Sequence, residues 1–438
     1  MNKILMDFHQ YFENEDFLDL PINEELYVIN NIELENGIAK NRALLDNIFS
    51  LFIAINNKVP IFIAGKPGCS KSLSIQLINK AMKDSSSTKE LFKQYPKIIL
   101  NSYQGSMASI SQGVLNVFRK AKEKLENLSP ENRKNNISMT FFDEMGLAEH
   151  SLNNPLKVIH SQLEYDQKED KDEKKDKNKD EKKVKNKENK NENKEENKEN
   201  TGKVDEEDLK LAFVAISNWA LDASKMNRGM YLSIPDPEIE DTKETSLTIG
   251  KSYNEQIGNL YKDFYKDLGT TYYKYKDYLT EYHSDDGKKD FHGNRDFYHL
   301  IKNAARTPLD YYKSGKIVDS ILIEIANKSS ERNFGGLKFY YSDYQTSLQA
   351  IKDKYKEINK DFQVNKQIDV VSRIKENIND LFSRYLLFIS KSSVSTFILG
   401  SILSDIKKDY SLYVGSQFPN DIQSEEYSLK ILNKIQLH

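Results

Sequence analysis

The sequence predicts an α/β domain with a parallel sheet, followed by a helical region and a small C-terminal α/β segment. Short apolar runs that suit buried strands alternate with stretches whose apolar residues recur at helical spacing, a pattern typical of parallel β–α–β units. A segment composed almost entirely of Lys, Glu, Asp and Asn, residues 166–208, interrupts this alternation. Beyond Thr248 the chain becomes helical in its spacing, rich in Tyr and highly charged.

The first half of the chain supplies the elements of the α/β domain. Apolar spacing from Ile32 to Asn56 predicts an amphipathic helix. Four apolar runs predict strands, namely Val59–Ala64, Ile98–Leu100, Ser138–Phe142 and Leu211–Asn218, and helices are expected at Lys71–Lys83 and Ser111–Leu125. Continuous apolar runs favour strands that are buried on both faces of a parallel sheet.

The second half predicts three helices, Asp296–Ala305, Ile317–Lys328 and Ile374–Leu386, and two strands, Tyr385–Ile389 and Ser411–Val414. We therefore divide the chain into an N-terminal extension (1–30), a core in two parts (31–165 and 209–248), the charged insert (166–208), a helical lid region (249–382) and a connector to a following module (383–438). The insert cannot bury enough apolar surface to offset its ordering entropy, so we expect a disordered, solvated spacer in a surface loop.

Composition excludes several classes of function. The 438 residues carry a net charge of only −3, which argues against a general attraction to nucleic acid or to an anionic membrane. The single cysteine, Cys69, excludes an internal disulfide framework and a Cys-based zinc finger in this chain, and favours a reducing, cytoplasmic setting. The first residues lack the apolar stretch of a signal peptide, and no run approaches the roughly 20 apolar residues of a membrane span.

A phosphate-binding loop is predicted where the first strand gives way to a helix, in the run Gly65-Lys66-Pro67-Gly68-Cys69-Ser70-Lys71-Ser72. A glycine-rich turn exposes backbone N–H groups, and the helix that follows adds its dipole. Lys71 is then expected to reach the β- and γ-phosphates of ATP, while the Ser72 hydroxyl binds Mg²⁺. Ser70 replaces the usual last glycine, which would either crowd the turn or require an unusual backbone angle.

Two strand ends carry polar residues that suit nucleotide hydrolysis. Asp143 and Glu144 end an apolar strand some 70 residues after the phosphate loop. Asp143 is the candidate to hold Mg²⁺, and Glu144 the candidate to polarise the attacking water. Asn218, at the end of another strand, suits the orientation of that water. Arg228 is positioned in the sequence to reach a neighbouring module as an arginine finger, although an exposed arginine is more often a surface charge.

This combination is the AAA+ ATPase pattern, and its details resemble the mysterin family of giant AAA+ ring-finger ubiquitin ligases. The phosphate loop through Leu73, with serine in place of the last glycine, is similar to that of the family. Further similar segments are Glu35–Asn41, Asp143–Glu149, Pro155–Lys157, Ile216–Asp222, Lys225–Gly229, Arg332–Gly336, Ser383–Leu387 and Gly415–Pro419. The resemblance therefore covers about Ile32 to His438.

The resemblance implies one catalytically competent AAA unit, the third of six, with ATP and Mg²⁺ as its ligands. The candidate nucleotide-binding residues are Gly65, Lys66, Pro67, Gly68, Cys69, Ser70, Lys71, Ser72 and Leu73, with Ser72 and Asp143 as metal ligands. Glu144, Asn218 and Arg228 match catalytic positions, and Arg295 lies where a lid-domain sensor arginine would be. The ligase activity does not carry over, because one cysteine cannot build the zinc sites of the family's ligase region.

Three functions remain open at this point. The first is an ATPase whose chemistry is coupled to movement of the lid, and the second is a scaffold that binds ATP with little turnover. The third, a small-molecule kinase, is disfavoured by the Asp143-Glu144 pair and the large helical region. The expected partners are neighbouring AAA+ modules and, from the family, proteins of the ubiquitin pathway; we expect neither a membrane span nor nucleic acid.

Overall fold

The computed structural model describes residues 16–163, 209–282, 290–313, 321–335, 338–355, 370–380, 383 and 394–406. Internal contacts divide the chain into two compact units, Met1–Phe362 and Gln363–His438. The insert at 166–208 and the strands expected at Tyr385–Ile389 and Ser411–Val414 lie outside the described residues. None of the described helices is both long and apolar enough to cross a membrane.

A five-stranded parallel sheet forms the centre of the first unit. Its strands are β1 (Ile61–Ala64), β2 (Lys97–Gln104), β3 (Asn136–Asp143), β4 (Ala212–Ser217) and β5 (Met230–Ser233), in the order β2-β3-β4-β1-β5. The four strands predicted from apolar runs are all present, so the predicted α/β class is confirmed. The fifth, β5, was not predicted because it is a short edge strand whose side chains are mostly exposed.

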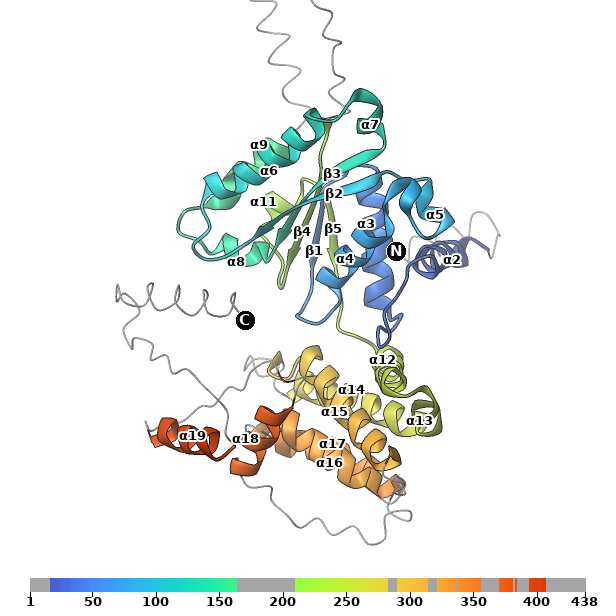
Figure 1. Cartoon of the computed structure of the whole chain (residues 1–438), viewed down its shortest axis with the longest axis vertical. Helices are drawn as coiled ribbons and strands as arrows, with labels where there is room; N and C mark the ends of the chain where they lie inside the picture. The colour runs from blue at the N-terminus through green and yellow to red at the C-terminus, as the bar shows by residue number, and fades with distance from the viewer. Residues whose placement is uncertain are drawn as a thin grey trace, which may run out of the picture. The chain divides into compact units, whose positions relative to one another are not determined.

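Side chains of the central strands alternate between two helical layers, as a pleated strand requires. Ile61 and Ile63 of β1 pack with helices α3 (Arg42–Asn56) and α4 (Lys71–Ala81), whereas Phe62 packs on the other face with helix α6 (Ser111–Glu126). Figure 1 shows α3 and α4 on one side of the sheet and α6 with α9 (Ile159–Leu163) on the other. Both faces of the central strands are therefore buried, which explains their continuous apolar runs.

The helix predicted over Ile32–Asn56 is shorter than expected and begins only at Arg42. Asn41 ends the preceding loop, and its side-chain oxygen accepts a hydrogen bond from the backbone N–H of Leu44. Gly37 in that loop has a φ of +91°, which interrupts helical geometry. The apolar residues before Arg42 still contribute to the core, but from a loop.

Further helices surround the sheet. They are α2 (Asp16–Asn30), α5 (Glu90–Lys93), α7 (Pro130–Lys134), α8 (Met145–Glu149) and α11 (Ala223–Met226), with short 3-10 turns at Asp84–Ser86 and Pro155–Val158. Helix α2 lies in the stretch that the sequence left as an extension.

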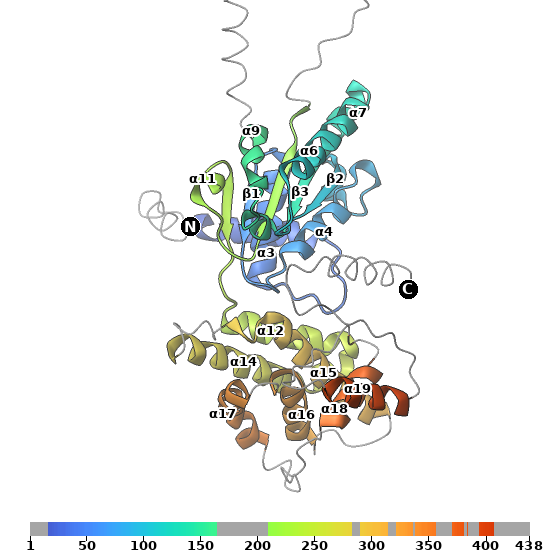
Figure 2. The same ribbon diagram turned by 90° about the vertical axis from the view of Figure 1, so that its left-hand side faces the viewer.

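A helical lid follows the sheet and has its own aromatic core. Its helices are α12 (Ile239–Tyr253), α13 (Glu255–Leu260), α14 (Lys262–Tyr282), α15 (Asn294–Lys313), α16 (Leu322–Phe334) and α17 (Lys338–Tyr355). Tyr272 stacks on Phe297 with 4.3 Å between ring centroids, and Phe334 contacts Tyr344 edge-on at 4.5 Å. Helices α12 and α14 lie side by side (Figure 2).

Two of the three helices predicted in this half are shifted along the chain. The helix expected at Ile317–Lys328 is observed as α16, which continues to Phe334. The helix expected at Ile374–Leu386 is observed in the second unit as α18 (Val370–Asn379), which ends well before Leu386. A further helix, α19 (Val394–Asp405), follows in the same unit. Helical periodicity does not identify the residue at which a helix begins or ends, so it misplaced these boundaries.

Candidate active site

The candidate active site lies at the carboxyl ends of β1, β3 and β4, where most of the polar residues singled out in the sequence come together. Parallel strands place their carboxyl ends along one edge of the sheet, the usual location of ligand sites in α/β folds. A cavity of about 270 Å³ opens there. It is lined by Pro67, Gly68, Ser70, Lys71, Ser72, Leu73, Glu144, Ile216, Ser217, Asn218, Arg295 and Tyr298.

The phosphate loop adopts two left-handed backbone conformations between β1 and α4. Gly68 has a φ of +92°, and Ser70 has a φ of +62° immediately before the first residue of α4. Ser70 therefore occupies the conformation that a glycine would adopt without strain. The replacement of the usual glycine is accommodated by an unusual backbone angle, one of the two outcomes expected from the sequence.

Lys71 is buried at the base of this loop, and its ammonium group is surrounded by oxygen atoms. Nζ donates to the carbonyl oxygen of Gly65, to that of Lys66 at 3.1 Å and to Oδ1 of Asn218 at 3.2 Å. These contacts hold the ammonium group against the carbonyl oxygens of the loop itself. A phosphate group in the cavity would offer Lys71 a charged partner in place of the neutral carbonyls.

Asn218 joins the lysine to the candidate catalytic carboxylate. Its Nδ2 donates to Oε2 of Glu144 at 2.8 Å, while its Oδ1 accepts from Lys71. Glu144 follows β3 with a φ of +51°. Gly105 lies so close to the Glu144 carbonyl that a Cβ at position 105 would overlap it. Asn218, which follows β4, thus links Lys71 of the loop–helix segment after β1 to Glu144 after β3.

Asp143 is half-buried at the end of β3. Burial, and then the negative charge of Glu144, raise the pKa of the Asp143 carboxyl above its usual value, against smaller opposing effects that include the charge of Lys71. Ser72, in the first turn of α4, lines the cavity, whereas Asp143 lies outside its lining. A serine hydroxyl and a carboxylate are hard oxygen ligands, and Mg²⁺ is commonly held by one or two protein oxygens together with phosphate oxygens. This donor set fits Mg²⁺.

The lid contributes two side chains to the cavity, both from the first turns of α15. Arg295, predicted as a sensor arginine, lines the cavity. The Tyr298 hydroxyl donates to the Gly68 carbonyl at 2.8 Å, and burial raises the pKa of that hydroxyl. A Cβ on Gly68 would lie 2.8 Å from that of Asn294. The glycine therefore permits close approach of the lid to the phosphate loop.

Arg228 lies apart from this cavity. Its Nε donates to the backbone carbonyl of Ser224 at 3.2 Å, in the turn between α11 and β5. Its positive charge contributes, after burial, to a lowered pKa of His160. The structure does not bring Arg228 to the site formed by its own chain.

Gly65, Lys66 and Cys69 complete the predicted loop without lining the cavity. Gly65 is packed tightly, since a Cβ there would lie 2.8 Å from the Cys69 sulfur. The Cys69 thiol is buried, and burial raises its pKa despite the nearby Lys71 ammonium. The Lys66 side chain instead extends to Asp236 and Asp290.

Two residues that contact the loop were missed by sequence reasoning. Tyr298 follows Arg295 by one helical turn, so the i, i+3 spacing on α15 could have indicated that both face the cavity. Asn47 lies on the buried face of α3 and donates from Nδ2 to the Cys69 carbonyl at 2.9 Å. A polar residue inside an otherwise apolar helix face was the available signal for Asn47.

Comparison with known families gives matches over most of the described core and the C-terminal end. Residues 37–241 match a family described as the RNF213 AAA domain, and residues 375–438 match a second family with the same description. A solved structure of C. elegans PCH-2 aligns with 72% of this chain and 71% of the PCH-2 chain, with 12% sequence identity and a TM-score of 0.30.

Curated relatives agree with the family matches. The chain is 29% identical over 96% of its length to zebrafish (Danio rerio) E3 ubiquitin-protein ligase rnf213-beta. It is 27% identical to human E3 ubiquitin-protein ligase RNF213 and 26% identical to the mouse protein, each over 95% of the chain. The chain spans about 7% of the length of each of these relatives. With its parallel sheet and phosphate loop, the region 37–241 of this chain is a mysterin-type (RNF213) AAA unit.

Proposed function

We propose that this chain binds ATP and hydrolyses it to ADP and phosphate, with nucleotide state coupled to movement of the lid against the sheet domain. The observation that carries the proposal is the hydrogen-bonded series Lys71–Asn218–Glu144 along the cavity. It places a phosphate-binding cation, a polar orienting group and a carboxylate in one small volume. Phosphoryl transfer depends mainly on such positioning and on charge neutralisation.

Each residue has a distinct role in the proposed reaction. Lys71 exchanges its carbonyl partners for the β- and γ-phosphates, and the backbone N–H groups of the loop bind the same oxygens. Ser72 and Asp143 hold Mg²⁺, which neutralises phosphate charge when bound. Glu144 orients the attacking water and accepts its proton, while Asn218 fixes the Glu144 carboxylate through the 2.8 Å hydrogen bond.

Two arginines would complete the charge stabilisation from different directions. Arg295 contacts the bound nucleotide from the lid, because it lines the cavity from the first turn of α15. Arg228 lies outside the cavity of its own chain, which suits action on the site of a neighbouring AAA+ module. The partners proposed here are therefore other AAA+ modules, in the same polypeptide or in a second one.

Turnover of ATP by the purified chain tests the proposal, with Lys71→Ala and Glu144→Gln as paired variants. Lys71→Ala should weaken ATP binding, whereas Glu144→Gln should retain binding and lower turnover by about 100-fold or more. Tight ATP binding without turnover, even when neighbouring modules are supplied, would instead support the nucleotide-gated scaffold. Absence of ATP binding would contradict both functions.

The longer relatives suggest the setting in which this unit works. The relatives are named E3 ubiquitin-protein ligases, so we propose that ATP hydrolysis here drives rearrangements in a protein of that kind, in a cytoplasmic setting, with proteins of the ubiquitin pathway as further partners. The separate family match at residues 375–438 supports a connector that leads into another AAA module. The position of this unit as third in such a series is part of the same proposal.

A further inference from the structure

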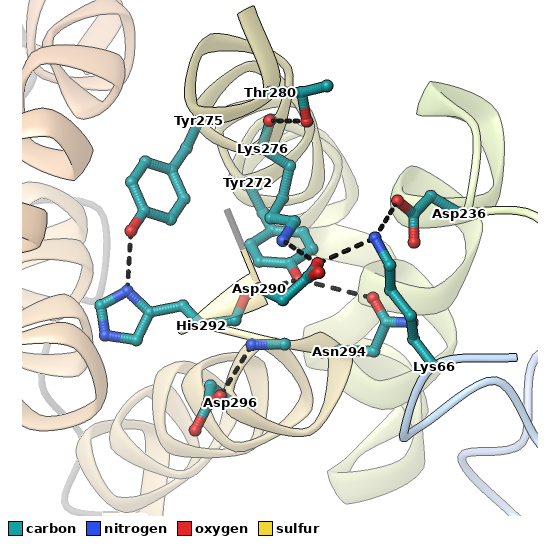
Figure 3. Close-up of polar contacts among 11 residues, drawn as sticks. Lys66, Asp236, Tyr272, Tyr275, Lys276, Thr280, Asp290, His292, Asn294 and Asp296 are labelled. Carbon is teal, nitrogen blue, oxygen red and sulfur yellow. Dashed lines mark hydrogen bonds and ion pairs between the residues drawn. The ribbon is translucent and has the colours of Figure 1, made fainter. Parts of the chain in front are cut away.

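Lys66 contacts the phosphate-binding lysine through its main chain and carboxylates beyond the sheet through its side chain. Its backbone carbonyl accepts a hydrogen bond from Nζ of Lys71 at 3.1 Å. Its own Nζ lies 2.5 Å from Oδ2 of Asp236 and 2.8 Å from Oδ1 of Asp290 (Figure 3). A single residue therefore contacts the phosphate-binding lysine through its main chain and two carboxylates through its side chain.

The two carboxylates lie on the segment that joins the sheet domain to the lid and on the segment that leads into α15. Asp236 lies between the end of β5 at Ser233 and the start of α12 at Ile239, where the chain passes from the sheet domain to the lid. Asp290 precedes α15, the helix that places Arg295 and Tyr298 beside the cavity. A change in lid position must therefore change the distances from Lys66 to these carboxylates.

Asp290 is fixed to the body of the lid rather than to an independent loop. Lys276 of α14 lies 3.6 Å from its Oδ1. His292, two residues after Asp290, is buried, and its Nδ1 shares a hydrogen bond of 2.8 Å with the Tyr275 hydroxyl. The Tyr272 hydroxyl donates to the His292 carbonyl at 3.3 Å (Figure 3). These bonds attach the segment that carries Asp290 to α14.

The charges along this path alternate in the order Asp236, Lys66, Asp290, Lys276. Burial alone would lower the pKa of Lys66, but hydrogen bonds to Asp236 and Asp290 and their negative charges outweigh it and raise that pKa. The Lys66, Asp236 and Asp290 side chains are 39%, 53% and 46% exposed. Ion pairs with this exposure are individually weak and sensitive to salt, so they can break and re-form as the lid moves.

We propose that Lys66 is a positioning residue and that Lys66, Asp236 and Asp290 form an ionic clamp that holds the lid against the phosphate loop and slows nucleotide release. The inference rests on the proposed nucleotide binding and adds a device that controls exchange. The clamp and a purely electrostatic effect of the two carboxylates predict opposite changes in nucleotide release when the carboxylates are removed. Removing two negative charges near bound phosphates would by itself tighten binding, whereas removing a clamp accelerates release.

The rate at which a fluorescent ADP analogue dissociates from the full chain, measured by stopped flow, distinguishes the clamp from the purely electrostatic effect. The double variant Asp236→Asn/Asp290→Asn keeps the side-chain shapes and should release the analogue about three- to tenfold faster than the parent. Added salt should accelerate release from the parent much more than from the double variant. Asp277→Asn, which removes an exposed carboxylate elsewhere on α14, is the matched control and should leave the rate unchanged.

A double-mutant cycle with Lys66→Met tests whether the three residues act as one unit. In the Lys66→Met background, Asp236→Asn/Asp290→Asn should produce no further acceleration. Slower release in the double variant, or full acceleration in the Lys66→Met background, would overturn the clamp. A parent that binds the analogue but releases it at the same rate as the double variant would overturn the clamp alone; a parent that does not bind it would contradict the proposed function as well.

Hydrogen exchange supplies a measurement that needs no nucleotide. Backbone amides at 290–298 should exchange several-fold faster in Asp236→Asn/Asp290→Asn than in the parent or in Asp277→Asn, because the lid opens more often. Equal exchange in all three proteins would overturn the clamp even if nucleotide binding failed.

Discussion

Nδ2 of Asn218 lies 2.8 Å from Oε2 of Glu144, and this hydrogen bond joins the end of β4 to the residue that follows β3. The same asparagine accepts from Lys71 through Oδ1. A single side chain therefore sets the orientation of both charged groups that we propose to act on ATP. Its two contacts give a direct prediction for each substitution.

Asn218→Ala should lower ATP turnover by about 10- to 100-fold, because the Glu144 carboxylate loses its donor and no longer holds the water in line. Asn218→Asp keeps the shape but places a second negative charge beside Glu144, and should be at least as damaging. Steady-state assays of kcat and KM check this. A change in KM alone would show that Asn218 acts in binding rather than in the chemical step.

Ser70→Gly should change the free energy of unfolding by less than about 1 kcal/mol, since relief of the left-handed backbone offsets the greater entropy of glycine in the unfolded chain. Ser70→Val should lose about 1–3 kcal/mol, because a β-branched residue fits a φ of +62° poorly. Urea unfolding of both variants measures the difference. Equal losses would mean that the Ser70 side chain, rather than its backbone angle, determines stability.

Gly68→Ala should weaken nucleotide binding and destabilise the protein by about 1–3 kcal/mol. Its φ is +92°, and the added Cβ would lie 2.8 Å from that of Asn294. Gly293→Ala is the matched control, because a Cβ at Gly293 meets nothing within 4 Å. Thermal unfolding and nucleotide titration should separate the two variants, and similar behaviour would contradict the close approach of α15 to the loop.

His292 should make stability depend on pH in the acidic range. Burial, and then the charge of Lys276, lower the pKa of His292 to about 4 from 6.5. The unfolded chain therefore binds the proton first, so stability is fully present above pH 6.5 and falls as pH decreases towards 4, by about 3 kcal/mol at most. Unfolding of His292→Asn should show a smaller loss over this range. The difference between the two proteins isolates His292 from carboxyls that titrate nearby, and identical pH profiles would contradict the prediction.

Arg228 should act on a neighbouring site rather than on its own. Arg228→Ala and Glu144→Gln chains should each have low turnover, but a mixture should recover activity, because Glu144→Gln supplies the arginine and Arg228→Ala supplies the carboxylate. Turnover measured across mixing ratios checks this. A mixture no more active than its components would remove Arg228 from the proposed mechanism.

Sequence reasoning located the central elements because their signals are local. The runs that became β1 and β4 are continuously apolar, as burial on both faces requires. By contrast, β5 is a short exposed edge strand, and α3 begins at Arg42 because Asn41 caps it, although apolar residues continue before it. Edge strands and caps depend on neighbours that a one-dimensional pattern does not identify.

The candidate site, like the fold, has some residues that could be predicted from the sequence and others that could not. Lys71, Glu144 and Asn218 each follow a predicted strand, so their convergence could be predicted from parallel topology. The direction of the Lys66 side chain could not, since its partner Asp236 lies 170 positions later in the chain. The i, i+3 spacing of Arg295 and Tyr298 indicates a shared helix face, but not that this face meets the phosphate loop. The contacts between the lid and the phosphate loop are therefore known from the structure and were not predicted from the sequence.

Strand β4 lies between the chain at 163–209, where an insertion would be remote from the site, and Asn218 of the site itself. Helix α9 ends at Leu163, and the described chain resumes at 209, three residues before β4 begins at Ala212; Asn218 follows the opposite end of that strand. Six residues of extended backbone place about 20 Å between those two ends. A reporter domain inserted between 163 and 209 should therefore leave the proposed chemistry intact, because the described chain rejoins the sheet at the end of β4 opposite Asn218.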